Sequence, residues 1–171
     1  MTECTTVAIL AGTAGKVHRR ETMGKVLHLF RAPRKRAPME ELDEARVVKQ
    51  VGFEGCAHAR PGGGGRQVLL VDVETLRAAN LQPGIIRENI TTEGIDVNAL
   101  EVGTKLTAGD VELEVSAVCE PCELMEELRA GLLEELQGRR GMLCRVLRGG
   151  TMKPGDAIEA NGRVSAGSAS L

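Results

Sequence analysis

The chain carries the run Val111-Glu112-Leu113-Glu114-Val115, in which apolar and acidic residues alternate. This alternation is typical of a strand with one buried face. The turn signal Ala108-Gly109-Asp110 precedes it, so residues 103–118 predict two short strands joined as a hairpin. The segment Val118-Cys119-Glu120-Pro121-Cys122-Glu123-Leu124 follows directly.

Four leucines then recur at helical spacing and predict a helix over residues 123–137: Leu124, Leu128, Leu132 and Leu136. Cys122 would lie at the start of this helix, where unpaired backbone N–H groups and the helix dipole favour negative charge. A thiol in that position ionises more easily than in free solution, and a thiolate is a nucleophile or a soft metal ligand. The alternative is a small buried residue, because free cysteine is among the most buried residue types.

The composition is that of a globular protein with a single core. A length of 171 residues favours one domain, and 42% hydrophobic and 27% charged residues fall in the ordinary range. The sequence has two Phe, no Trp and no Tyr. Base stacking on aromatic side chains is therefore nearly excluded, and a net charge of -2 argues against a general attraction to nucleic acid or anionic membranes.

The localisation expected from the sequence is the cytoplasm. No run approaches the roughly 20 apolar residues that cross a bilayer. The apolar run Val7-Ala8-Ile9-Leu10 is too short for a signal peptide. Five cysteines are an odd number, which argues against a disulfide framework and for thiol chemistry or burial.

Short strands and turn glycines recur along the chain. Residues 1–22 are interpreted as an N-terminal extension and residues 161–171 as a disordered tail. Further strands are predicted at 24–30, 44–51, 66–73, 84–91, 141–147 and 157–159, with a short helix at 74–80. Many short strands and one substantial helix favour a mainly β protein, built as a barrel decorated by helices.

Two loops could attract an anion. Arg31 to Arg36 is a basic segment, either a solvated loop or a basic rim that attracts a phosphorylated or anionic ligand. Residues 52–65 are rich in glycine, whose exposed N–H groups could cradle an anion. This loop is not a P-loop, because it lacks the Gly-Lys-Ser/Thr ending, and a flexible connector is the alternative.

Four kinds of site are compatible with the cysteines and histidines. A structural zinc site would use Cys119 and Cys122, but no clear second ligand pair follows. A thioredoxin-like pair lacks its βαβ context. A Cys–His hydrolase would pair Cys122 with His58. The last is a Cys122 thiolate that binds a soft or oxo metal, with Arg66, Arg87 and the glycine loop meeting a phosphate.

A series of short motifs resembles one known family, the MOSC domain, named for the C-terminal domain of molybdenum-cofactor sulfurase. The resemblance covers residues 23–160. It rests on Gly52-Phe53-Glu54-Gly55, Ala57-His58-Ala59, Arg66-Gln67-Val68, Pro83-Gly84, the run from Glu88 to Ile95, Val102-Gly103-Thr104, Pro121-Cys122, Arg140-Gly141 and the run from Gly149 to Asp156.

The resemblance implies a closed or partly open β-barrel, of the MOSC or PK β-barrel-like type, with a cleft that holds one functional cysteine. In enzymes of the family this cysteine binds the molybdenum of a pterin cofactor (molybdopterin), and N-hydroxylated compounds are reduced. In the sulfurase context the domain binds the cofactor and helps sulfur reach it. A molybdenum oxidoreductase or sulfur-transfer activity is therefore expected, or else a non-catalytic carrier of the cofactor or a persulfide; a zinc-bound thiol protein is the remaining alternative.

Mapped onto this sequence, Cys122 matches the family's cysteine and is the expected molybdenum ligand and catalytic residue. His58 is the expected proton donor, since histidine titrates near neutral pH and reduction of an N–O bond consumes protons. The residues expected to bind the cofactor are Gly55, Arg66, Gln67, Arg87 and Asn89. Surface ion pairing is an equal alternative for Arg87.

The sequence departs from the family pattern at Cys56, where relatives commonly have Asp. The loss of that carboxylate removes an orienting acceptor for His58, and it adds a thiol that would favour sulfur handling. Cys119 could act as a resolving thiol. Expected partners are the molybdenum cofactor and a redox partner or cofactor-biosynthesis protein, without nucleic acid or membrane. Pyridoxal phosphate is associated with the family, but no lysine here argues for a Schiff base, so it is not expected to act.

Overall fold

The computed structural model describes residues 22–62 and 64–161. Its strands are β1 (Thr22–Arg31), β2 (Glu40–Glu41), β3 (Ala45–Val48), β4 (Gly52–Phe53), β5 (Val68–Asp72), β6 (Ile90–Glu93), β7 (Lys105–Ala108), β8 (Val111–Val118), β9 (Met142–Arg148), β10 (Gly150–Met152) and β11 (Ala157–Asn161). Its helices are α1 (Val73–Ala78), α2 (Glu123–Leu128) and α3 (Leu132–Glu135), with a 3-10 turn η1 (Val97–Ala99). The predicted extension and tail lie outside the described residues, apart from Thr22 in β1 and Asn161 in β11.

Seven of these strands close into a barrel. Their order is β11-β7-β8-β9-β5-β6-β1, and β11 pairs back onto β1 with Thr22 opposite Ala160 and Lys25 opposite Ala157. The barrel leaves neither β1 nor β11 with a free edge at the seam, which removes a template for pairing with other chains. The expectation of a mainly β, closed barrel is confirmed.

One pair of neighbours in the barrel is parallel. β5 and β6 run side by side with Leu70 opposite Ile90, and α1 begins directly after β5 on the path between them. Asp72 ends the strand and caps the helix, because its carboxylate accepts the N–H of Thr75 at 2.7 Å. The predicted strand at 66–73 and helix at 74–80 correspond to this unit.

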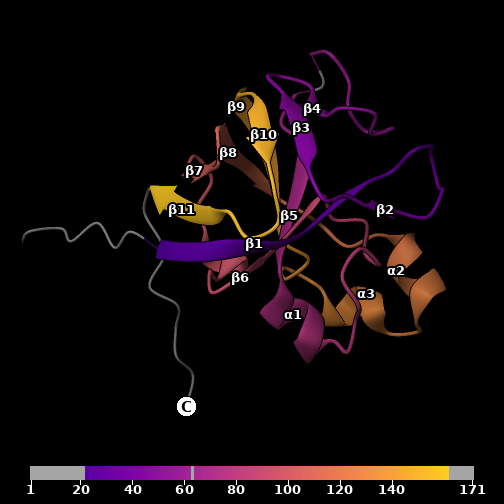
Figure 1. The fold of residues 1–171 in the computed structure, drawn as a ribbon. Helices are drawn as coiled ribbons and strands as arrows, with labels where there is room; N and C mark the ends of the chain where they lie inside the picture. Colours follow the sequence, from indigo (N-terminus) through magenta and orange to yellow (C-terminus); the bar gives the residue numbers. More distant parts are fainter. Residues whose placement is uncertain (1–21, 63, 162–171) are drawn as a thin grey trace, which may run out of the picture.

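The core has two parts, one inside the barrel and one beneath the helices. Both faces of β5 are buried: Val68 and Leu70 join the barrel interior, whereas Leu69 and Val71 pack under the helices. The second cluster consists of Leu69, Val71, Leu76, Ala79, Ile86, Cys119, Met125, Leu132, Leu136 and Leu143. Figure 1 shows the three helices gathered at one side of the barrel, away from β3, β4 and β10. None of the helices in the described residues is long and apolar enough to cross a membrane.

Two predicted elements were wrong in part. The helix predicted over 123–137 is broken into α2 and α3, because Gly131 adopts a left-handed φ of 80° between them. The carboxylate of Glu126 stabilises the break by accepting the N–H groups of Gly131 and Leu133. The strand predicted at 84–91 begins only at Ile90, since Gly84 and Arg87 both have positive φ and turn the chain before it.

Candidate functional site

Cys122 lies between the end of β8 and the start of α2. Its backbone is extended and its carbonyl accepts the N–H of Met125 at 2.8 Å, but its side chain makes no capping hydrogen bond. The thiol is exposed. Because α2 has only six residues, it contributes little of the dipole that the sequence pattern suggested. The charge that bears on this sulfur comes from a side chain instead.

Arg140 supplies that charge. Its Nη1 lies 3.8 Å from Cys122 Sγ and donates to the carbonyl of Glu120 at 3.0 Å. Its Nη2 donates to the carbonyl of Ile86 at 3.2 Å, and the residue is only 8% exposed. Arg140 therefore holds the cysteine segment against the turn that precedes β6, and a thiolate at Cys122 would compensate its buried charge.

A cavity of about 420 Å³ lies beside Cys122. Five cationic side chains line it: Lys35, Arg36, Arg66, Arg87 and Arg140. Glu120 is the one acidic residue in the lining. The other lining residues are His58, Gln67, Val68, Leu69, Asn89, Cys119, Cys122, Leu124 and Leu143. Such a concentration of positive charge in a chain of net charge -2 makes this cavity suited to an anionic ligand.

Two of the arginines have nitrogen atoms that are buried without a hydrogen-bond partner among the described residues. They are Nη2 of Arg87 and Nε of Arg140. Arg87 also holds a positive φ of 70°, and its Nη1 donates to the carbonyl of Ala37 at 2.7 Å. A buried N–H without an acceptor is costly, so these two groups indicate that an acceptor from outside the chain completes the site.

Gln67 and Asn89 line the cavity but are already bound to the backbone. The carbonyl oxygen of Gln67 accepts the N–H of Val146 at 2.9 Å, and its amide nitrogen donates to Gly64 at 2.7 Å. Asn89 accepts the N–H of Leu69 at 3.0 Å and donates to the carbonyl of Phe30 at 3.1 Å. Their main contribution is to hold the cavity wall in place.

The structure brings together six of the seven residues predicted for the site: His58, Arg66, Gln67, Arg87, Asn89 and Cys122. His58 lies within the glycine-rich loop, Arg66 directly follows it, and both residues are exposed. Gly55 is not among the described residues that line the cavity. It has a left-handed φ of 73°, which favours glycine, so its role is in the conformation of the loop.

The other described cysteines differ in their tendency to ionise. Burial raises the pKa of Cys119, which lines the cavity, and raises the pKa of Cys144 in β9 to about 12. Burial also acts to raise the pKa of Cys56. Hydrogen bonds with the His58 side chain and with backbone groups outweigh this effect and lower the pKa to about 7. Cys56 Sγ lies 3.8 Å from Nδ1 of His58.

Cys122 also faces a second hollow of about 610 Å³, lined by Arg36, Arg87, Cys122, Glu123, Leu124 and Glu127. An apolar groove of about 430 Å³ adjoins both and shares Arg36, Arg87 and Leu124 with them. Ile85 and Leu128 are exposed in this groove. The sulfur is therefore reached from the cationic cavity and from the side of α2.

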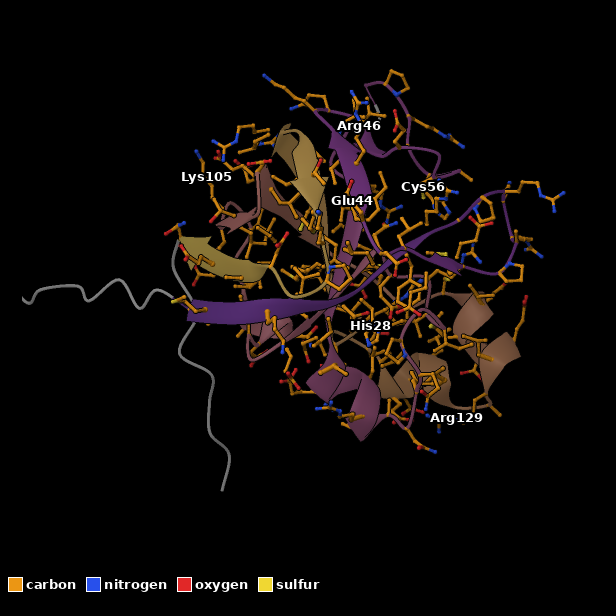
Figure 2. The ribbon with its side chains drawn as sticks, in the orientation of Figure 1. His28, Glu44, Arg46, Cys56, Lys105 and Arg129 are labelled. Carbon is orange, nitrogen blue, oxygen red and sulfur yellow. The ribbon has the colours of Figure 1, made fainter. Side chains whose placement is uncertain are left out.

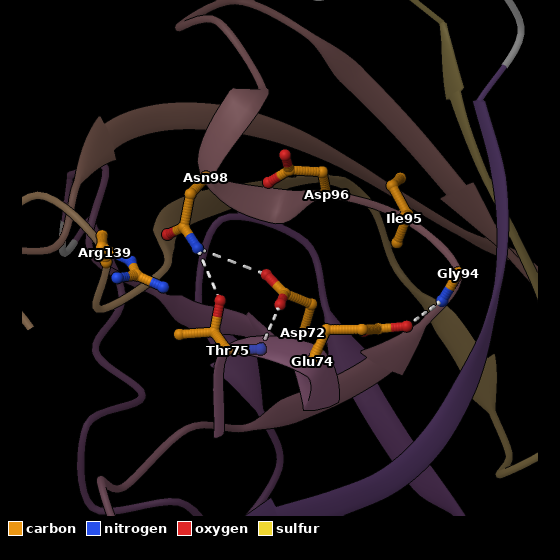
Figure 3. Close-up of a pocket in the computed structure, with 8 residues that line it drawn as sticks. All are labelled: Asp72, Glu74, Thr75, Gly94, Ile95, Asp96, Asn98 and Arg139. Carbon is orange, nitrogen blue, oxygen red and sulfur yellow. Dashed lines mark hydrogen bonds between the residues drawn. The ribbon is translucent and has the colours of Figure 1, made fainter. Parts of the chain in front are cut away.

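A hollow of about 540 Å³ beside α1 is a poorer candidate, although it contains three carboxylates. Figure 3 shows Asp72 bound to the N–H of Thr75 and to Asn98, and Glu74 bound to the N–H of Gly94. Asp96 caps η1 by accepting the N–H of Ala99 at 3.2 Å. These carboxylates satisfy backbone donors and fix local turns. Across residues 22–62 and 64–161, no group of three or more His, Cys, Asp or Glu side chains is arranged to hold a metal ion.

The pattern of the MOSC domain matches residues 58–159 of this chain. Among solved structures, the YuaD protein from Bacillus subtilis is similar with a TM-score of 0.73 and 19% identity, covering 84% of this chain and 98% of that one. YiiM from Geobacillus stearothermophilus gives 0.68 and 18%, covering 84% and 77%. YiiM from Escherichia coli gives 0.61 and 20%, covering 85% and 71%. At these identities the structures establish the shared fold. No curated protein matches the chain.

The main residue that the sequence pattern did not assign to the site is Arg140. The pair Arg140-Gly141 is part of the family resemblance, but nothing in its spacing shows that the guanidinium reaches Cys122, 18 positions earlier. Lys35 and Arg36 belong to the basic segment that was predicted either as a solvated loop or as a rim. The structure places both along the cavity.

Proposed function

Because this chain belongs to the MOSC domain family, we propose that it binds a molybdenum cofactor in the cationic cavity, with the Cys122 thiolate as the protein ligand of molybdenum. The proposal rests most on one observation. An exposed cysteine sulfur lies beside a cavity in which two arginines keep buried N–H groups without acceptors. A phosphorylated pterin bearing a soft metal would supply both the missing acceptors and the partner for the thiolate.

The residues of the cavity would have different roles in holding the cofactor. Arg87 and Arg140 would donate to the anionic groups, while Lys35, Arg36 and Arg66 add positive charge at the rim. Arg140 also fixes the position of Cys122 through the Glu120 carbonyl, so that the thiolate is oriented before the ligand arrives. Gln67 and Asn89 keep the wall rigid through their backbone hydrogen bonds.

We propose that the loaded protein reduces N-hydroxylated compounds. When bound, the molybdenum cofactor supplies the electrons, which a redox partner would replenish. Reduction of an N–OH group to N–H releases water and consumes two protons, so the site needs a proton donor. His58 is exposed on the cavity wall and is the residue we assign to that role.

A second function of the same site is delivery of the cofactor or of a persulfide without turnover. It is favoured by the position of Cys122, which is exposed and opens toward the hollow beside α2 as well as toward the cavity. A partner could therefore reach the sulfur from outside while the cofactor lies on the inner side. Zinc binding through the cysteines has weaker support, because the described residues offer no three-ligand group.

The ligand role of Cys122 is tested by metal analysis. The wild-type protein, Cys122→Ser and Cys144→Ala are purified from cells that make the molybdenum cofactor, and molybdenum is measured by mass spectrometry. We expect molybdenum in wild type, a loss of about tenfold or more in Cys122→Ser because serine is a harder and more basic ligand, and full retention in Cys144→Ala.

Cys144→Ala is the matched control because Cys144 is buried in β9 and does not line the cavity. Equal molybdenum in wild type and Cys122→Ser, including none in either, would refute the ligand role. Stoichiometric zinc in place of molybdenum would support the zinc alternative. Reduction of an N-hydroxylated base by the loaded protein with a chemical electron donor separates the enzyme from the carrier, which would bind molybdenum without turnover.

A further inference from the structure

Cys56 lies on the glycine-rich loop between β4 and β5 (Figure 2) and forms a cluster with His58 and Asn89, the Cys56 cluster. Its sulfur lies 3.8 Å from Nδ1 of His58 and 3.7 Å from the amide nitrogen of Asn89, which donates to it. The loop is fixed at this point, because the N–H of Cys56 donates to Phe53 and the N–H of Ala57 donates to Ala32 at the end of β1. The sulfur therefore has two side-chain partners, of which one can also accept a proton.

The surroundings of Cys56 favour its ionised form, unlike those of the buried thiols of Cys119 and Cys144. Burial acts to raise its pKa, but the His58 hydrogen bond and charge, together with backbone hydrogen bonds at Ala32 and His58, bring the pKa down to about 7. Cys119 is buried to a similar degree and has a raised pKa, and Cys144 has a pKa of about 12. The difference between Cys56 and Cys119 follows from the partners of the sulfur, whereas complete burial alone raises the pKa of Cys144.

The Cys56 cluster adjoins the cationic cavity. Both of its partners, His58 and Asn89, line that cavity, so the thiol lies directly behind its wall. Cys56 is 7% exposed, whereas His58 is exposed. The sulfur is therefore separated from the cavity by an exposed side chain, of a kind that changes rotamer in picoseconds to nanoseconds. Five cationic side chains line this same cavity, which favours an anion in it.

We propose that Cys56 is a second reactive thiol of this protein, which attacks soft anionic electrophiles that enter the cationic cavity, with His58 as its proton acceptor. In the step, the proton of the thiol passes to the imidazole, and the sulfur lone pair forms a bond to the electrophilic atom. The leaving group departs with the electron pair of the bond that breaks. This function goes beyond cofactor binding by Cys122 and does not require it.

The two roles of His58 are compatible. An imidazolium formed by taking the proton of Cys56 is itself an acid, which is what the proposed reduction requires. Two described side chains contact the Cys56 sulfur, and a third, that of Arg31, lies close to Gly55 on the same loop. His58 is on the same loop, Asn89 is neutral and precedes β6, and the guanidinium of Arg31 lies close to Gly55 and is paired with Glu40 at 3.0 Å. None of these is a carboxylate that would oppose ionisation of Cys56.

The experiment measures alkylation of each cysteine in the native, cofactor-free protein. Iodoacetate serves as the anionic electrophile and iodoacetamide as its neutral match; in both, the sulfur displaces iodide and forms a C–S bond. Rates at each cysteine are followed by peptide mass spectrometry across about pH 5 to 10, with glutathione as the free thiol. We expect the Cys56 rate to reach half its maximum near pH 7, whereas the Cys119 and glutathione rates still rise above about pH 8.5.

Two variants separate the parts of the proposal. His58→Gln should slow alkylation of Cys56 by iodoacetamide at pH 7 by roughly tenfold, since the lost thiolate fraction is partly offset by greater nucleophilicity at higher pKa. Arg66→Gln should lower the ratio of iodoacetate to iodoacetamide rates at Cys56 by about two- to fivefold and leave the iodoacetamide profile in place, because Arg66 adds charge to the cavity without contacting the sulfur.

A second readout does not depend on access. The ultraviolet absorbance of thiolate in wild type minus that in Cys56→Ser gives the titration of Cys56 directly, with the midpoint expected near pH 7. The proposal is overturned if this midpoint matches free cysteine, if native Cys56 resists both reagents, or if His58→Gln leaves its rate unchanged. Because neither readout uses molybdenum, these outcomes are independent of the metal content of Cys122→Ser.

Discussion

Glu88 is an acidic side chain enclosed by the structure, between two residues that line the cavity. It is fully buried, and its Oε1 accepts the N–H of Gly84 at 2.5 Å and the hydroxyl of Thr91 at 3.1 Å. Oε2 is buried without a partner in the described part of the chain, and burial raises the pKa of this carboxyl. The neutral acid is therefore the form that the fold prefers, and it closes the turn that carries Arg87 and Asn89.

Replacement of Glu88 by Gln should therefore be tolerated, whereas Glu88→Ala should cost about 1–3 kcal/mol, since Gly84 and Thr91 lose their acceptor. A raised native pKa gives stability that is complete below the unfolded value of 4.5 and is lost as pH rises through the native value. Glu88→Gln has no such loss, so its stability relative to wild type should increase from pH 4.5 upward. Urea unfolding followed by circular dichroism at acidic, neutral and mildly alkaline pH measures this difference.

Glu101→Gln, at an exposed carboxylate, is the control and should show no comparable trend with pH. A Glu88→Gln protein whose stability falls relative to wild type as pH rises would contradict a raised pKa for Glu88. It would mean that the native state stabilises the ionised carboxylate of Glu88 rather than the neutral acid.

At the scale of elements, the start of β9 is the point where the barrel and the site are joined. Gly141 has a φ of 100°, and a Cβ there would overlap the carbonyl oxygen of Leu70 and lie 2.8 Å from Cγ2 of Val71. Its carbonyl accepts the N–H of Cys119 at 2.9 Å. The preceding residue is Arg140, so the close approach of β9 to β5 also sets where the guanidinium meets Cys122.

We expect Gly141→Ala to destabilise the protein by about 3 kcal/mol or more, because left-handed strain of about 1–2 kcal/mol adds to overpacking against β5. Gly103→Ala is the matched control: its φ is also positive, at 91°, but a Cβ there meets nothing within 4 Å, so only the strain of about 1–2 kcal/mol applies. Urea denaturation of both variants tests the difference. Equal losses would show that the contact with β5 relaxes at no cost.

The elements that the sequence could predict are those whose pattern is local. The hairpin of β7 and β8 follows from alternation and from Ala108-Gly109-Asp110, and the structure pairs Ala108 with Val111. The parallel pairing of β5 with β6 could not be predicted, since it depends on which strands meet in the closed barrel. The break after α2 also escaped the leucine pattern, because Leu124 before it and Leu132 and Leu136 after it all pack in the same cluster.

The site was accessible to sequence reasoning to a similar extent. Cys122 was singled out by its place between a strand and a helix, and His58, Arg66 and Arg87 were candidates from their residue types. The family resemblance added Gly55, Gln67 and Asn89. The contact of Arg140 with the sulfur is a product of tertiary packing, since Arg140 bridges the carbonyls of Glu120 and Ile86 from a distant part of the chain. No local pattern encodes such a contact.

At the scale of the whole molecule, the barrel is held together with very little aromatic packing. Phe30 and Phe53 are both buried and are the two aromatic residues of the sequence, so Val, Leu, Ile and Ala fill most of the interior. Closure depends on β11, which pairs with β1 on one side and β7 on the other. Ile158 and Ala160 point from this strand into the core, and both are buried. Loss of packing at β11 should therefore weaken the barrel as a unit.

Cys144 offers a direct measure of that cooperativity in a chain without Trp or Tyr, because it is fully buried and its pKa is raised to about 12. We expect the native thiol to react with iodoacetamide only when the barrel opens. Ile158→Ala, which removes a fully buried side chain at about 2–5 kcal/mol, should speed this labelling by about 30-fold or more. Glu159→Ala, at the exposed neighbour, should not. If iodoacetamide labels Cys144 equally fast in the two variants, β11 frays without opening the barrel. Pairing of β1 with β11 would then not be what protects Cys144 from the reagent.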